Sequence, residues 1–105
     1  MGKPETRRLD KAIQQTNRKL EAVRNRELWP LDGRERRAVL SALASGSYRI
    51  VRGNSPARAE QRLDTAWQSA ETRLITELAA LRTERLRIVR EAAAVKAAKK
   101  SSGWW

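Results

Sequence analysis

The feature that most constrains this chain is a stretch of 44 residues, 57–100, that contains neither glycine nor proline. Glycine and proline are the residues least compatible with a helix interior, and the stretch is rich in the strong helix formers Ala, Leu, Arg and Glu. Ser55-Pro56 precedes it, with serine placed to cap a helix and proline placed in its first turn. We therefore predict one helix over about 56–100, roughly 68 Å long at 1.5 Å per residue.

Apolar side chains recur along this predicted helix at helical spacing. Trp67 starts a series of apolar residues that repeats every seven positions, and Leu63, Ala70 and Leu78 widen it into a stripe. Alanine replaces the large apolar residues from Ala92 onward, so we expect the end of the helix to be loosely packed. The part of the stripe that we assign to an oligomer or partner contact consists of Leu74, Leu78, Leu81, Ile88 and Val95.

A shorter helix is predicted over 5–28. Its apolar positions are four and three residues apart in alternation, a spacing typical of a helix that packs lengthwise on another helix. Trp29-Pro30 ends the pattern, because the residue before proline avoids the helical region. These apolar positions are Leu9, Ile13, Thr16, Leu20 and Val23.

A second short helix is predicted over 33–45. Asp32 and Glu35 have the spacing of a capping box at its start, and Gly46 is a natural stop. Tyr48, Ile50 and Val51 then favour extended structure, which predicts a short extended segment near 48–52. That segment is either an apolar loop folded onto the helices or a strand that pairs with a second copy of the chain.

The sequence thus predicts an all-α protein of three helices, 5–28, 33–45 and 56–100, in which the long helix overhangs the bundle. Residues 1–100 form a single helical domain, and residues 101–105 form a flexible tail whose Trp104 and Trp105 could stack on bases or dock on a protein. The first helix is about half as long as the last, so part of the apolar stripe lacks a cover within the chain. We therefore expect a homodimer.

The charge of the chain is the strongest functional signal. Twenty-three basic residues against twelve acidic ones give a net charge of +11 and a pI near 11.4. Such a charge attracts polyanions, and nucleic acid and an acidic protein are the two partners we consider. Basic residues outnumber acidic ones by seven to two within residues 81–100. We call this end of the long helix the basic arm; its basic residues are Arg82, Arg85, Arg87, Arg90, Lys96, Lys99 and Lys100.

Positive charge repeated along a helix suits the phosphates of nucleic acid, and of the nucleic acids we expect DNA. The basic arm contains no Asn or Gln that could read adenine, which favours backbone contacts over sequence recognition. A secondary basic patch is predicted at Arg34, Arg37, Arg49 and Arg52. We expect a small accessory or regulatory nucleic-acid-binding protein. The alternatives are a helical interaction protein of coiled-coil type, a helix-turn-helix-like pair and a two-stranded ribbon reader.

Catalysis is not expected. The chain contains no histidine and no cysteine, so the usual nucleophile–base pairs and thiolate zinc sites are excluded. Glu77, Glu84 and Glu91 recur every seven residues but lack the Glu-x-x-His partner of a carboxylate metal site. We expect no metal and no cofactor. Neither a signal peptide nor a membrane span is recognisable in the sequence, which predicts a cytoplasmic protein.

Overall fold

The computed structural model describes residues 5–102, with side chains described for residues 5–100. It contains three α-helices, namely α1 (Arg7–Arg24), α2 (Gly33–Val51) and α3 (Ala57–Ser102). The described part of the chain is 84% helical and contains no strand. The predicted all-α class and the long C-terminal helix are therefore confirmed. Residues 101 and 102 of the predicted tail continue α3, whereas Trp104 and Trp105 lie outside the described residues.

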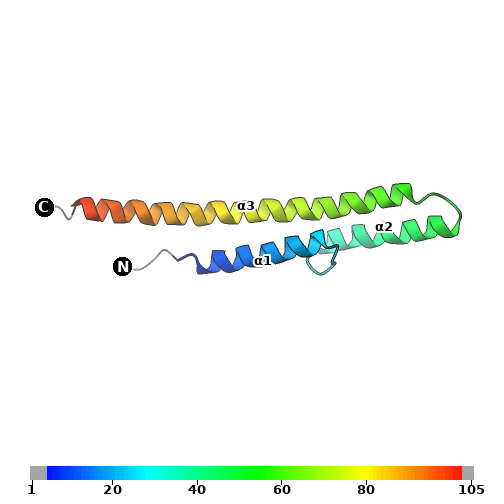
Figure 1. The fold of residues 1–105 in the computed structure, drawn as a ribbon, viewed down its shortest axis with the longest axis horizontal. Coiled ribbons are helices and arrows are strands. Elements are labelled where there is room, and N and C mark those ends of the chain that lie inside the picture. The colour runs from blue at the N-terminus through cyan, green and yellow to red at the C-terminus, as the bar shows by residue number, and fades with distance from the viewer. Residues whose placement is uncertain (1–4, 103–105) are drawn as a thin grey trace.

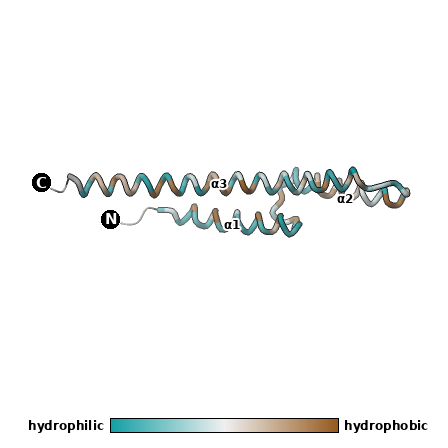
Figure 2. Tube along the Cα trace, turned by 45° about the horizontal axis from the view of Figure 1, so that its top comes forward, coloured by the Kyte–Doolittle hydropathy of each residue, from teal (hydrophilic) through white to brown (hydrophobic). Residues whose placement is uncertain are grey.

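The three helices form a rod and not a three-helix bundle. The molecule measures 84 × 18 × 18 Å, so its width accommodates only two helices of about 10–12 Å each. Its radius of gyration is 22.1 Å, whereas a globular chain of this length has about 13 Å. Both α1 and α2 pack along α3 and follow one another along its length (Figure 1). The view in Figure 2 shows that they approach α3 at different angles around its axis.

Ion pairs between α1 and α3 mark the register of this antiparallel pair. Arg85 Nε lies 2.6 Å from Asp10 Oδ1, and Arg24 Nε lies 3.2 Å from Glu71 Oε1. The first pair joins the start of α1 to the first third of the predicted basic arm. Residues beyond this level of α3 extend past α1 (Figure 1), and every side chain from position 93 to position 100 is exposed. The predicted overhang is therefore present.

The core lies along the inner face of α3. Leu74 and Ala70 are fully buried, and Trp67 and Leu78 are nearly so. They pack in one cluster with residues from α1, from the connection between α1 and α2, and from α2: Leu20, Val23, Leu31 and Val39. Burying side chains of this size stabilises the fold by roughly 1.5–3 kcal/mol each. Helices α1 and α2 are therefore stabilised by packing against α3 and against Leu31 of the segment that connects α1 to α2.

Helix α1 ends four residues earlier than the sequence predicts. The Arg26 backbone N–H donates to the Val23 carbonyl at 2.9 Å, and that of Glu27 donates to the Ala22 carbonyl at 2.9 Å. These two bonds make a Schellman motif, in which the residue after the cap adopts a left-handed conformation. That residue is Arg26, with φ of 62°. Glycine or asparagine usually occupies this position, so the sequence carries no ordinary stop signal here.

The start of α2 follows the prediction closely. Glu35 N–H donates to Asp32 Oδ1 at 2.8 Å, and Asp32 N–H donates to Glu35 Oε1 at 3.0 Å, which completes the capping box. Arg73 of α3 then holds this helix start in place. Its Nε and Nη2 donate to the two carboxylate oxygens of Glu35 at 2.7 and 2.9 Å, and Nη2 also donates to the Pro30 carbonyl at 3.2 Å.

The end of α2 corrects the sequence-based prediction. The helix runs through Gly46 to Val51, so residues 48–51 are helical and the predicted extended segment near 48–52 is wrong. Gly46 is not a stop but a point of close helix contact, because a Cβ there would lie 3.4 Å from the Ala59 Cβ. Gly53, with φ of 77°, is the residue that ends α2, and its left-handed conformation completes a second Schellman motif.

Candidate nucleic-acid interface

Two arginines of the basic arm are already engaged within the protein. Arg85 pairs with Asp10, and Arg87 pairs with both Glu84 and Glu91 on its own helix. Hydrogen bonds from Arg85 and from the Thr6 hydroxyl lower the pKa of Asp10. The Arg87 guanidinium lowers the pKa of Glu84 in the same way. Both carboxylates therefore stay ionised near neutral pH, and a phosphate would have to compete with them for these two arginines.

Four other cations of the basic arm have no carboxylate partner among residues 5–100: Arg82, Arg90, Lys96 and Lys100. Successive residues of a helix turn by about 100°, which places Arg82, Lys96 and Lys100 within about 40° of one another on α3. These three side chains cover about 27 Å of the helix axis. Arg90 lies to one side of this line on the surface of α3. Lys99 also belongs to the arm and is exposed.

The predicted secondary basic patch lies entirely on α2. Arg34 and Arg37 are in its first half, whereas Arg49 is in its last turn and Arg52 is its C-terminal cap. The Arg52 guanidinium lies over the Tyr48 ring at 5.4 Å and donates from Nε to the Tyr48 hydroxyl at 3.1 Å. Helix geometry spreads the four arginines over about 120° of the α2 surface. They form two pairs about 22 Å apart along the axis, and not one compact patch.

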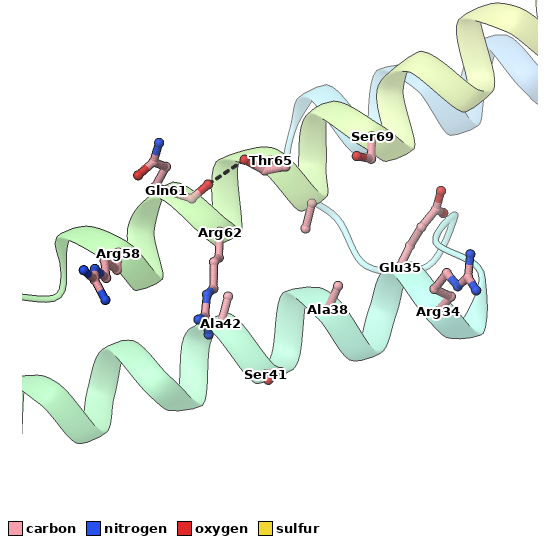
Figure 3. A pocket seen from close by; sticks show the side chains of 11 residues that line it. Arg34, Glu35, Ala38, Ser41, Ala42, Arg58, Gln61, Arg62, Thr65 and Ser69 are labelled. Carbon is pink, nitrogen blue, oxygen red and sulfur yellow. Dashed lines mark hydrogen bonds between the residues drawn. The ribbon is translucent and has the colours of Figure 1, made fainter.

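A groove that was not predicted from the sequence lies between α2 and α3, and we call it the arginine groove (Figure 3). Its volume is about 740 Å³, and Arg34, Arg58 and Arg62 bring positive charge to it. Small and polar side chains complete the lining: Ala38, Ser41, Ala42, Gln61, Thr65, Ala66 and Ser69, together with Glu35. None of the described aromatic side chains lines it, so stacking on bases by these residues has no support there.

A sequence signal for this groove does exist. Positions 58, 62, 65 and 69 are four, three and four residues apart, and positions 34, 38 and 41 repeat the same spacing on α2. Each set therefore occupies one helix face. Arginine and small or hydroxyl residues fill both sets. These two patterns indicate a groove only when the two helix faces are known to lie side by side in the fold.

The predicted oligomer or partner stripe is only partly accessible. Leu74 and Leu78 are buried by the chain's own residues, so they are not available to a partner. Leu81 and Ile88 are half-buried, and Val95 is 54% exposed. The two most exposed large apolar side chains of the described residues lie instead in the last turn of α2: Ile50 at 64% and Val51 at 84%.

Other classes of site are not found in the described chain. No group of three or more acidic side chains in residues 5–102 is placed to hold a metal ion. None of the three helices, as far as they are described, is long and apolar enough to cross a membrane.

Comparison with known proteins identifies no relative. No family model, no curated protein and no solved structure matches this chain.

Proposed function

We propose that this protein binds nucleic acid, chiefly DNA, through phosphate contacts made by the basic arm of α3, as a small accessory or regulatory factor of the cytoplasm. The observation that carries the proposal is the exposed line of Arg82, Lys96 and Lys100 along α3, whose two lysines lie on the helix end that extends past α1. Each contact between such a cation and a phosphate releases counterions from the nucleic acid, which favours binding. The net charge of +11 adds a long-range attraction for the same ligand.

The composition of the basic arm favours binding without sequence preference. Residues 81–100 contain no Asn or Gln, the side chains that pair bidentately with adenine. Lysine and arginine can contact phosphates in any sequence, because the backbone presents the same charge at every step. The proposed activity is therefore general binding to the nucleic-acid backbone.

Fluorescence anisotropy with a labelled duplex tests this proposal. Arg82→Glu combined with Arg90→Glu should weaken binding to duplexes of any sequence and should make the salt slope shallower by about 0.9 for each phosphate that the variant no longer neutralises. Arg18→Glu combined with Arg36→Glu is the matched control. It makes the same change in net charge at exposed positions outside the basic arm. Equal loss of affinity in the two double variants would show that only net charge matters and that the arm is not the binding surface.

A second candidate function rests on the apolar residues of α2. Ile50 and Val51 are 64% and 84% exposed, and Arg49 and Arg52 flank them in the sequence, which would suit a protein partner with apolar and acidic side chains. In this alternative the chain is a helical interaction protein. The predicted homodimer belongs to the same class of proposal. Light scattering after size exclusion distinguishes a homodimer from a single chain that awaits a different protein partner, since a homodimer has twice the 12.0 kDa mass of one chain.

A further inference from the structure

The arginine groove has the chemistry of a phosphate site. Its three arginines, Arg34, Arg58 and Arg62, have no carboxylate partner among the described residues. Among the described residues Glu35 is the one acidic residue of the lining, and both of its carboxylate oxygens already accept hydrogen bonds from Arg73. The groove therefore presents uncompensated positive charge over a floor of alanines, where guanidinium groups can bind phosphate oxygens.

The arginine groove and the basic arm face opposite sides of the rod. At about 100° per residue, Arg58 and Arg62 lie within about 40° of each other on α3. The line of Arg82, Lys96 and Lys100 lies about 150° further around the same helix. The stretch between Arg62 of the groove and Arg82 of the arm, residues 63–81, contains one basic residue and three acidic ones. Arg73, that basic residue, is bound to Glu35 and Glu77. The two surfaces are therefore separate along α3 and around it.

One duplex cannot lie against both surfaces without strong bending. Arg62 and Arg82 are about 30 Å apart along the axis of α3, and the whole rod is 84 Å long. Duplex DNA has a persistence length of about 500 Å, so it behaves as a stiff rod over this distance. A duplex bound on one side of α3 leaves the other side open to a second duplex.

We propose that the arginine groove is a second phosphate-binding surface, so that one rod bridges two separate segments of nucleic acid. This inference rests on the proposed function of the basic arm and adds a second ligand segment to it. The continuous α3 helix would set the spacing between the two segments. Bridging of this kind brings distant parts of a nucleic acid together without requiring any sequence preference.

Energy transfer between two duplexes tests the inference. Two duplexes of about 20 base pairs, close to the rod in length at 3.4 Å per base pair, carry a donor and an acceptor dye and are mixed with the protein. The wild-type protein should produce a transfer signal, and excess unlabelled duplex should abolish it. The groove variant is Arg34→Gln, Arg58→Gln and Arg62→Gln. The matched control is Arg18→Gln, Lys19→Gln and Arg36→Gln, which removes the same charge from residues outside the groove.

The energy-transfer signal of the groove variant should be at least fivefold weaker than that of the wild type, whereas the control should retain most of the wild-type signal. Both should still bind a single duplex in anisotropy measurements, and circular dichroism should show the same helix content. A groove variant that bridges as well as the control overturns the inference while leaving the proposed function intact; bridging by a homodimer through two arms would give this result. Failure of the wild-type protein to bind duplex overturns the proposed function as well.

Discussion

Arg73 provides the sharpest test of how the rod is held together. Its guanidinium joins α3 to the start of α2 through Glu35 and to the connection before it through the Pro30 carbonyl. Arg73→Met keeps an unbranched side chain of similar reach but removes all three hydrogen bonds. The Glu35 side chain, only 11% exposed, then loses its partner while remaining charged. We expect α2 to be less firmly attached to α3.

The magnitude follows from the geometry. Hydrogen bonds that involve a charged group contribute about 1.5–3 kcal/mol each when they are buried. Arg73 remains 35% exposed, which reduces that contribution. We therefore expect Arg73→Met to lower the free energy of unfolding by about 2–3 kcal/mol in total. For a chain of this size that corresponds to a fall in Tm of at least about 8 °C.

Urea denaturation followed by circular dichroism at 222 nm measures the change. Glu77→Gln is the control, because its ion pair with Arg73 is long, at 3.5 Å, and exposed, so it should change stability by less than about 0.5 kcal/mol. Glu35→Gln keeps an acceptor for the capping box. Combining it with Arg73→Met therefore isolates the charge pair, and we expect a coupling energy of about 1–2 kcal/mol. An Arg73→Met protein as stable as the wild type would refute the reasoning.

Two further predictions concern stability. Gly46→Ala should stabilise the protein by about 0.5–1 kcal/mol, because alanine is the better helix former and its Cβ would lie at an ordinary 3.4 Å from the Ala59 Cβ. Gly46→Val should instead destabilise the protein by about 1–3 kcal/mol through overpacking. Urea titration measures both changes, and a valine variant more stable than the alanine variant would contradict the close contact. Arg85 lowers the pKa of Asp10 in the folded state. The ion pair therefore stabilises the fold above the pKa of Asp in the unfolded chain, near 3.9, and this stabilisation is lost as the pH falls through the pKa of Asp10 in the folded protein. Thermal melts below about pH 4 should therefore show a weaker dependence on pH for Asp10→Asn than for the wild type, and identical profiles would contradict the pairing.

Much of the fold could be predicted because local signals agreed with one another. The absence of Gly and Pro over 57–100 predicted α3, and Asp32 with Glu35 predicted the start of α2. The ends of the short helices were harder. Tyr48, Ile50 and Val51 favour strands individually, yet they continue a helix whose partner is α3. Gly46 was predicted as the stop of α2, but it lies at a close contact with Ala59 and the helix continues until Gly53.

The candidate interface was predicted less completely than the fold. Counting charges identified the basic arm, but it could not show that Arg85 and Arg87 are occupied by Asp10, Glu84 and Glu91. Arg58 and Arg62 belong to residues 56–80, where three arginines and four acidic residues nearly cancel, so a count of charges does not single them out. Their importance depends on α2 lying beside α3, which is a long-range fact of the fold. The same holds for Leu74 and Leu78, whose burial depends on where α1 and α2 pack.

The salt dependence of duplex affinity tests the central claim most directly. Titrations of the wild-type protein with one labelled duplex, repeated at several salt concentrations, give the slope of log affinity against log salt. If Arg82, Arg90, Lys96 and Lys100 each neutralise one phosphate, the slope should be about −3.6 or steeper, and it should be the same for duplexes of unrelated sequence. A slope near zero, or no binding at low salt, would contradict the proposed role of the basic arm.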